Sequence, residues 1–317
     1  MAEETRAVDQ PAVAAAGTGA HAASSGIAAS PPTAGAPLGP GDHGGSRIVT
    51  RRPGQQESDP RRYRNRRRRI EVGLGIAVPV LLFVSWQWAS KTGALDPHFF
   101  PAPTDLWSTA VTSFHSGIMG HLIVTSFRRV LEGFFMGVAA ALVLGVAIGA
   151  SHIARAALQP VIYALWAIPK LAILPLLLLF FGLSEFPIIL LIAIECFFLV
   201  LIPTIAAVST VSESYREVAT SFNATRRQML RYVLIPGAMP LIVVALRLAA
   251  GASVLVMVAA EYIDGKPGLG FYIFNSWQLA ESKQMYVGII VVSVLGTVWT
   301  LVIQAVGRYF TRWQRET

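Results

Sequence analysis

Charge is scarce in this sequence. Of its 317 residues, 14% are charged and 54% are hydrophobic, whereas a soluble domain carries about one quarter charged residues. The balance excludes an ordinary soluble domain and predicts a membrane protein. Because the apolar residues are concentrated after about residue 70, the membrane part is expected to begin there.

Cysteine and the motifs of catalysis are also scarce. The only cysteine, Cys196, lies in an apolar run, so no intrachain disulfide can form and an inert thiol is expected. The six histidines show no zinc-like spacing. No Gly-x-x-x-x-Gly-Lys-Ser/Thr segment is present to hold ATP phosphates. We therefore expect no catalytic residue, no metal and no cofactor on this chain, and a membrane enzyme is disfavoured.

The net charge is +8, which by itself would admit a nucleic-acid partner. Most basic residues, however, flank apolar runs, which is typical of membrane orientation. A lipid bilayer, and no nucleic acid, is the expected partner.

The first 60 or so residues are rich in Ala, Gly, Pro, Ser and Thr and have no sustained periodicity. Such a segment predicts disorder, and it lacks the apolar core of a secretory signal. A basic run follows it: Arg61, Arg62, Arg64, Arg66, Arg67, Arg68 and Arg69. Residues 1–69 are thus interpreted as a disordered cytoplasmic tail that ends in a basic anchor beside anionic lipid.

The rest of the chain predicts an all-α membrane protein. Apolar runs of about 20 residues can cross a bilayer, and six are found, at 70–89, 124–150, 158–181, 186–208, 236–260 and 285–307. The third contains Pro160, Pro169 and Pro175, so kinks are expected there. Glycines spaced for close helix packing occur in the second: Gly133, Gly137, Gly145 and Gly149.

The distribution of Lys and Arg predicts the orientation. With the N-terminus inside, the cytoplasmic flanks hold the 61–69 run, Arg155, Arg216, Arg226, Arg227, Arg231, Arg308, Arg312 and Arg315. The outside holds only Lys91, Arg128, Arg129, Lys266 and Lys283. This bias predicts that both termini are cytoplasmic. Arg128 and Arg129 are expected to pair with Glu132, which follows within one helical turn.

Two external segments, 90–123 and 262–284, remain. The first holds an amphipathic stretch from Asp105 to about Phe114, and the second is rich in aromatic residues. Interfacial helices and an outer gate are both compatible with these segments.

The loop 209–235 is polar and is predicted to lie in the cytoplasm as two short helices joined at Asn223-Ala224. Thr225-x-x-Gln228 forms a capping box that would start the second helix. Its apolar face would be Met229, Leu230, Val233 and Leu234, and Pro236 would end it and open the fifth span.

Glu217-Val218-Ala219, followed by Val233-Leu234-Ile235-Pro236, resembles the EAA loop of ABC importer permeases. Further motifs agree in order: Pro101-Ala102-Pro103-Thr104-Asp105, Ile168-Pro169-Lys170 through Leu176, Phe181-Gly182, Glu261-Tyr262-Ile263 and Gly268-Leu269-Gly270. They resemble the nitrate, sulfonate and taurine branch of type I importers. The resemblance covers 122–317 as the permease domain, with 70–121 as a first helix and external segment.

The resemblance implies that the loop docks on a separate cytoplasmic ATPase subunit, which would bind the ATP. The positions implied for coupling are Glu217, Val218, Ala219, Asn223, Arg226, Arg227, Val233, Ile235 and Pro236. Asn223 replaces the family's usual glycine but tolerates positive φ, so the turn is expected to be kept. Val218 replaces an alanine on what is expected to be the packing face. A purely local capping box of Ser214 with Glu217 is the alternative role for that carboxylate.

Charged residues within spans are candidates for the translocation path: Lys170, Glu195, Arg247 and Glu261. Lys170 and Glu195 fall at similar depth, so a structural ion pair is favoured over a path role. Arg247 could meet an anionic substrate or satisfy helix carbonyls.

We therefore expect the permease of an ATP-driven importer of the plasma membrane, acting as a homodimer with an extracytoplasmic binding protein. Membership of the branch implies a small anion such as a sulfonate, taurine or nitrate, with pyrimidine or thiamine precursors as the alternative. An ion-coupled secondary transporter is disfavoured, because no internal repeat is evident.

Overall fold

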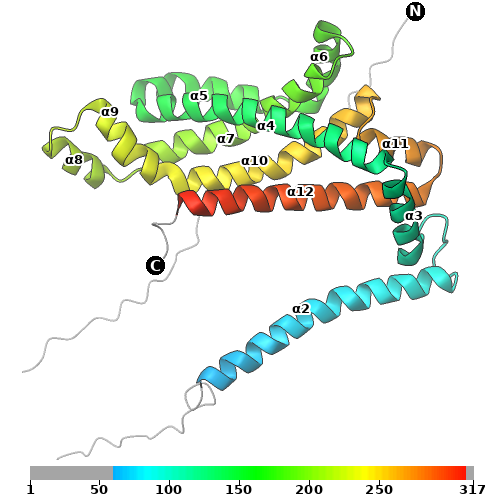
Figure 1. Cartoon of the computed structure of the whole chain (residues 1–317). Helices are drawn as coiled ribbons and strands as arrows, with labels where there is room; N and C mark the ends of the chain where they lie inside the picture. The colour runs from blue at the N-terminus through cyan, green and yellow to red at the C-terminus, as the bar shows by residue number, and fades with distance from the viewer. Residues whose placement is uncertain (1–59, 312–317) are drawn as a thin grey trace, which may run out of the picture. The chain divides into compact units, whose positions relative to one another are not determined.

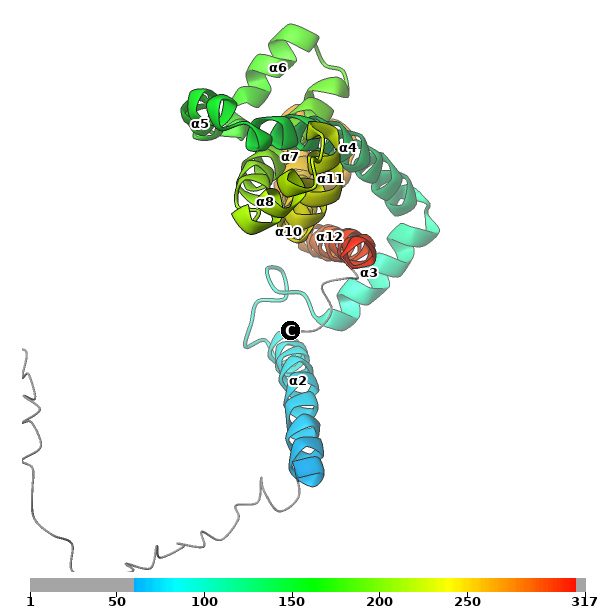
Figure 2. The ribbon, with the colours of Figure 1, turned by 90° about the vertical axis from the view of Figure 1, so that its left-hand side faces the viewer.

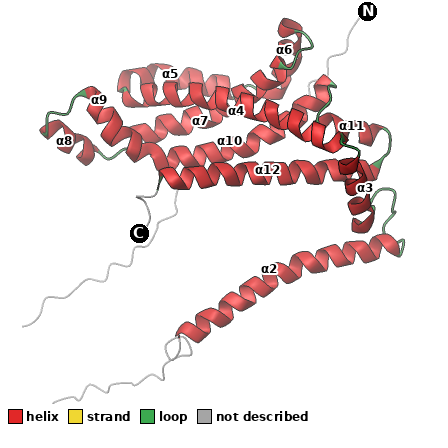
Figure 3. Cartoon of the chain, viewed as in Figure 1, coloured by secondary structure: helices red, strands yellow, loops and turns green. Residues whose placement is uncertain are grey.

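The computed structural model describes residues 60–311, with side chains from residue 70 onward. All regular elements of this range are helices (Figure 3). Five helices are long and apolar enough to cross a membrane, and a bent pair makes a sixth candidate. The predicted all-α protein with about six spans is confirmed. The tail over 1–59 lies outside the described residues.

The chain forms a succession of long helices separated by short ones (Figure 1). In order they are α2 (Pro60–Lys91), α3 (Pro103–His115), α4 (Ile118–Ala150), α5 (His152–Trp166), η1 (Lys170–Ile173), α6 (Leu174–Phe181), α7 (Phe186–Ser209), α8 (Glu213–Ser221), α9 (Arg226–Met229), η2 (Leu230–Leu234), α10 (Ile235–Asp264), α11 (Leu269–Gln278) and α12 (Ser282–Phe310). The predicted spans fall on α2, α4, α5 with α6, α7, α10 and α12. The two external segments fold as α3 and α11.

The helix α2 begins at Pro60, about ten residues earlier than the sequence places the first helix. Its apolar part, Ile70–Lys91, is long enough to cross a membrane. Polar contacts near its C-terminal end join it to the segment that leads into α3. The Ser90 hydroxyl donates to the Phe100 carbonyl at 2.8 Å, and the Gln87 amide donates to the Thr104 hydroxyl at 3.1 Å.

The helices α4, α7, α10 and α12 pack side by side in that order (Figures 1 and 2). The contact of α4 with α7 depends on glycine. A Cβ on Gly133 would lie 2.7 Å from a backbone oxygen of α7, and one on Gly137 would overlap the Ala193 carbonyl. Gly145 and Gly149 continue the same close face. The predicted role of these glycines in close helix packing is confirmed.

Aromatic rings fill the contact of α4 with α12. The indole of Trp299 is buried and meets the rings of Phe127 and Phe134 edge-on, with centroids 5.6 and 5.2 Å apart. Edge-to-face geometry is the favoured arrangement for such rings. This cluster and the buried leucines, isoleucines and alanines of α7 and α10 form the main core.

The third predicted span is broken rather than kinked, so a single helix over 158–181 is wrong. α5 ends at Trp166, and the segment from Lys170 to Phe181 leaves at an angle of 78° to it. Pro169 explains the break, because it lacks an amide hydrogen and disfavours a helical conformation at Ile168.

The two ends of the bundle carry different elements (Figure 1). α8 and α9 lie at one end, where α4 and α7 finish and α10 starts. α11 lies at the other end, where α4 and α7 start and α10 finishes. We refer to these as the α8 end and the α11 end.

Candidate functional site

The turn between α8 and α9 is a Schellman motif. Asn223 has φ 53°, in the left-handed region. Its amide donates to the Thr220 carbonyl at 2.8 Å, and the Ala224 amide donates to the Ala219 carbonyl at 3.0 Å. These are the two hydrogen bonds of that motif. The expectation that asparagine preserves the turn is confirmed.

The predicted capping box of α9 is present. The Thr225 hydroxyl accepts from the Gln228 amide at 3.3 Å, and the Thr225 amide donates to the Gln228 side chain at 2.8 Å. This box sets the direction in which the chain leaves the turn.

Pro236 opens α10 but does not end the preceding helix, which corrects the sequence interpretation. The helix is continuous from Arg226 to Asp264 and passes through the π-helical turn η2. The Ile235 amide donates to the Leu230 carbonyl, five residues back. This wider turn accommodates the proline, which would clash with a carbonyl in a regular α-helix. Val233, Ile235 and Pro236 are half-buried there.

One exposed side of α8 carries apolar side chains. Tyr215, Val218 and Phe222 are 68%, 56% and 83% exposed, and their spacing of three and four residues places them on one side of the helix. We call these three residues the α8 stripe. Val218 therefore belongs to the exposed face, not to the packing face on which the sequence placed it. Ala219 is half-buried.

Glu217 lies in the middle of α8 and is exposed. The local capping box of Ser214 with Glu217 is not formed, because the N-cap residue is Ser212 and makes no side-chain cap. On α9, Arg226 and Arg227 are also exposed. The carboxylate and the two guanidinium groups thus face outward at the α8 end.

The segment between α7 and α10, residues 210–234, is attached to both of these helices. The Arg216 guanidinium donates to the Val208 carbonyl of α7 at 2.9 Å. Val211 packs on Gly237 of α10, where a Cβ would approach the valine side chain to 3.1 Å. Leu234 is buried against α7 and α10. A displacement of α8 would therefore act on both long helices.

Lys170 and Glu195 are brought together, as the sequence favoured. Their charged atoms lie 3.9 Å apart, and both side chains are largely buried. The ammonium also donates to the Trp166 carbonyl at 2.7 Å and lies 5.4 Å from the indole centroid. Lys170 thus satisfies a carbonyl released by the break between α5 and η1.

Arg247 lies within α10 and is exposed. It makes no hydrogen bond or ion pair with another residue whose side chain the structure describes. Leu241, Val244 and Leu248 are exposed beside it. This face of α10 therefore combines apolar side chains with an exposed guanidinium group.

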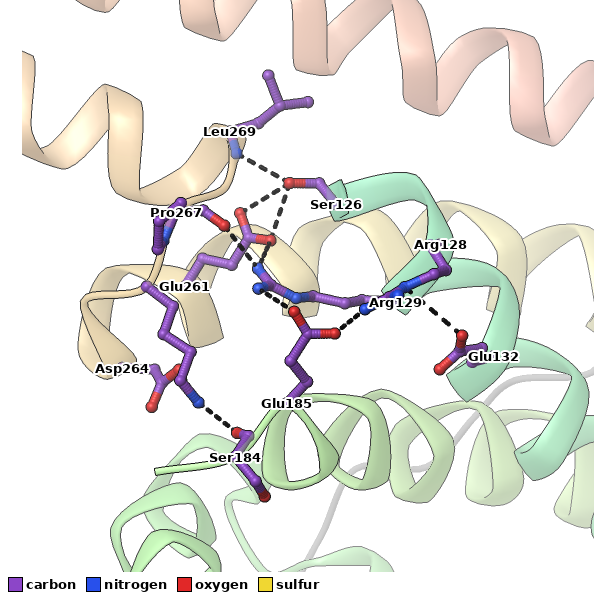
Figure 4. A network of polar contacts seen from close by, with 11 residues as sticks. Ser126, Arg128, Arg129, Glu132, Ser184, Glu185, Glu261, Asp264, Pro267 and Leu269 are labelled. Carbon is purple, nitrogen blue, oxygen red and sulfur yellow. Dashed lines mark hydrogen bonds and ion pairs between the residues drawn. The ribbon is translucent and has the colours of Figure 1, made fainter. Parts of the chain in front are cut away.

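Glu261, the fourth path candidate, lies in a buried polar network at the α11 end (Figure 4). Its carboxylate accepts from the Arg129 guanidinium at 2.7 Å, from the Ser126 hydroxyl at 2.8 and 3.0 Å, and from the Gly270 amide at 2.8 Å. The Ser126 hydroxyl in turn accepts from the Leu269 amide at 2.8 Å. One carboxylate and one hydroxyl thus satisfy the first amides of α11, which would otherwise lack partners.

The glycines that flank Leu269 make room for this network. A Cβ on Gly268 would overlap the Glu261 carboxylate, and one on Gly270 would lie 2.5 Å from the Val258 carbonyl. The spacing Gly268-Leu269-Gly270 is therefore explained by the close approach of α10 to the start of α11.

Arg129 extends the network to a third element. Its guanidinium lies 3.2 Å from the Glu185 carboxylate, directly before α7, and Arg128 pairs with the same carboxylate (Figure 4). Arg128 also lies 3.6 Å from Glu132, as predicted. The expected pairing of Arg129 with Glu132 is wrong, because Arg129 is 1% exposed and points into the bundle. We call Ser126, Arg128, Arg129, Glu185 and Glu261 the α11-end clasp.

The sequence interpretation missed the clasp as a unit and the α8 stripe as a surface. Two adjacent arginines within an apolar run are a signal of buried partners. For the stripe, the spacing of Tyr215, Val218 and Phe222 within a polar loop was visible in the sequence.

A protein-family model described as the inner membrane component of binding-protein-dependent transport systems matches residues 133–316. Named relatives agree with that match. The chain is 30% identical over 240 residues to a protein of Bacillus subtilis (strain 168) that carries the name aliphatic sulfonates transport permease protein SsuC, covering 75% of this chain and 87% of that one.

Two further relatives carry other substrate names. The chain is 31% identical over 242 residues to the taurine transport system permease protein TauC of Escherichia coli (strain K12), covering 75% of this chain and 88% of that one. It is 33% identical over 174 residues to the nitrate import permease protein NrtB of Leptolyngbya laminosa, covering 55% and 62%.

Proposed function

The chain belongs to the family of binding-protein-dependent transport system inner membrane components, and from this premise we propose how it is driven and what it carries. It is a permease subunit of an ABC importer. The driving subunit is a cytoplasmic ATPase, which holds the ATP that this chain does not bind. The transported solute is a small anion of the sulfonate, taurine or nitrate type.

The docking of the ATPase is proposed at the α8 end, and the observation that carries it is the α8 stripe. Three apolar side chains on one exposed helix face form a surface that a partner can bury. Glu217 of α8 and Arg226 and Arg227 of α9 add exposed charges at the same end of the bundle. The bond of Arg216 to α7 and the packing of Val211 on Gly237 of α10 support transmission of motion from that surface into the bundle.

Replacement of Glu217 tests the docking. Glu217→Ala is expected to insert normally but to uncouple ATP hydrolysis from uptake in vesicles. Glu213→Ala is the matched control, since Glu213 is an exposed carboxylate on the same helix but one full turn away. Normal ATP-driven uptake by Glu217→Ala would remove the docking assignment.

We infer that the α8 end lies in the cytoplasm and the α11 end outside, and the distribution of Lys and Arg supports this orientation. An extracytoplasmic binding protein then delivers the solute at the α11 end. Cysteine labelling with a membrane-impermeant reagent at Ser116→Cys and Ser221→Cys, both exposed positions, tests the orientation in intact cells, and only Ser116→Cys is expected to react.

A second copy of the chain is proposed to cover the face of α10 that carries Arg247. Within a membrane, charged side chains face a bundle interior or a water-filled path rather than lipid. The exposed Arg247 therefore supports a homodimer in which this face borders the path between the copies. Native mass spectrometry of the assembled transporter tests the stoichiometry.

The solute class follows from the names of the relatives, which are sulfonate, taurine and nitrate permeases. Competition for uptake in reconstituted vesicles, with sulfonates, taurine, nitrate and a pyrimidine or thiamine precursor, identifies the solute. Competition by only the heterocyclic compounds would overturn the anion assignment. Uptake that follows an ion gradient without ATP would indicate a secondary transporter instead.

A further inference from the structure

One helix joins the two ends of the molecule. The helix from Arg226 to Asp264 has 39 residues, which corresponds to about 58 Å at 1.5 Å per residue. It starts in the coupling loop and carries Glu261 near its other end. A helix without a break can transmit a displacement along its axis over this length.

At its far end the helix is fixed to its neighbours through Glu261, whose side chain is fully buried. Both carboxylate oxygens are engaged, by Arg129 and Ser126 of α4 and by the Gly270 amide. Charge-assisted hydrogen bonds in a buried setting are the strong ones. The end of α10 therefore cannot move without α4 and the start of α11.

Arg129 also contacts a residue outside α10 and α11 (Figure 4). One guanidinium nitrogen bonds Glu261 at 2.7 Å, and the other lies 3.2 Å from Glu185. The short loop that follows α6 begins at Gly182 and ends at Glu185. A second bond holds the same loop, since the Lys266 ammonium donates to the Ser184 carbonyl. Arg129 thus connects α10 to the loop between α6 and α7.

The connected helix α6 is weakly packed. Only Leu174 and Leu177 of its eight residues are buried, whereas Leu179 and Phe180 are 78% and 71% exposed. An element with few buried contacts is among the first to move. The Lys170–Glu195 ion pair holds η1, which precedes α6, and the α11-end clasp holds the loop that follows α6.

We propose that Arg129 is a positioning residue that transmits displacement of α10 from the coupling loop to the end of α6, the outer half of the broken span. The transmission rests on the proposed function, since it needs an ATPase at the α8 end to move α10. The physical link itself does not depend on that function and can be tested without it.

The primary experiment removes the contact between Arg129 and Glu185 by changing Glu185, the more exposed of the two residues. Glu185→Gln removes the charge that joins α4 to the α6–α7 loop but leaves the buried bond of Arg129 to Glu261. Glu132→Gln is the matched control, because Glu132 pairs with Arg128 on the same helix and bonds no second element among the residues whose side chains the structure describes. Hydrogen–deuterium exchange of the full-length chain in nanodiscs is measured for both.

The α6–α7 loop, residues 182–185, is expected to exchange at least about tenfold faster in Glu185→Gln, whereas α4 and the core of α7 should be unchanged. Glu132→Gln should exchange like the unmodified chain. Arg129→Lys keeps a positive charge but lacks the planar fork that contacts two carboxylates at once. It is expected to loosen the same loop. Equal exchange in all four proteins would overturn the link.

A second measurement tests the transmission. In vesicles that contain the assembled transporter, Glu185→Gln and Arg129→Lys should retain ATP hydrolysis but lower the solute moved per ATP several-fold, and Glu185→Asp should restore part of it. A structural role alone would lower both activities together, and an unchanged ratio would overturn the transmission. If the unmodified transporter moves no solute with ATP, the proposed function fails while the exchange result still decides the link.

Discussion

The two ends of α10 differ in whether the charged side chains near them are exposed or buried. At the α8 end, Glu217, Arg226 and Arg227 are exposed, as are the apolar side chains of the α8 stripe. At the α11 end, Arg129 and Glu261 are 1% and 0% exposed and bond each other. The first arrangement leaves groups available to a partner, and the second uses them within the chain.

This contrast separates a docking surface from an internal joint. A surface charge contributes little to folding because water screens it. A buried carboxylate that loses its partners is strongly destabilising. Substitutions at the α8 end should therefore change assembly and coupling, whereas substitutions at the α11 end should change the stability of the chain itself.

The largest expected effect is that of Glu261→Ala. It leaves the Gly270 amide and the Ser126 hydroxyl without their acceptor and removes the stronger partner of Arg129. Breaking such a buried pair costs about 3–5 kcal/mol of the free energy of unfolding, which lowers the unfolding midpoint by roughly 10 °C for a chain of this size. Thermal unfolding followed by intrinsic fluorescence in nanodiscs measures it.

Glu217→Ala, the same substitution at the other end, is the control for that comparison. Its unfolding midpoint should stay within about 2 °C of the unmodified chain, as for most exposed substitutions. Similar shifts for the two variants would show that the ends do not differ as described.

An intermediate effect is expected for Phe222→Ala. Phe222 is the most exposed member of the α8 stripe, at 83%, and its truncation leaves the chain's own packing unchanged. A buried aromatic anchor contributes about 2 kcal/mol to an interface, or roughly 30-fold in affinity. Binding of the purified ATPase subunit to permease in nanodiscs, by surface plasmon resonance, measures the change. Ser221→Ala, the adjacent exposed position, should bind as the unmodified chain does.

The cap and the turn of the segment between α7 and α10 could be predicted from the sequence, because each depends on a few neighbouring residues. The spacing of Thr225 and Gln228 specifies a cap within four residues, and Asn223 specifies a left-handed turn at one position. Most span boundaries were predicted within a few residues for the same reason, since each apolar run is continuous. The pairing of Lys170 with Glu195 also followed from the depth of each residue in adjacent antiparallel spans.

The α11-end clasp could not be predicted from the sequence, because its residues are far apart in the chain. Ser126 and Glu261 are separated by 135 residues, and only the packing of α4, α7 and α10 brings them together. A helix pattern assigned Arg129 to its neighbour Glu132, since i,i+3 contacts are all that one helix reveals. The break of the third span was underestimated because proline predicts a disturbance but not whether the helix resumes in the same direction.

The smallest expected effect concerns the turn at Asn223 and tests whether the α8 end depends on backbone geometry as well as on its stripe. Asn223→Gly should keep the turn, since glycine adopts positive φ without strain. Asn223→Val places a β-branched residue at φ 53° and should raise the free energy of the loop by about 1–2 kcal/mol. Amide exchange at residues 219–225 should then be roughly tenfold faster for Val and unchanged for Gly. If amide exchange in Asn223→Val were the same as in Asn223→Gly, the Schellman motif would not be what fixes α8 relative to α9. The orientation in which α8 presents the α8 stripe to its partner would then not depend on this turn.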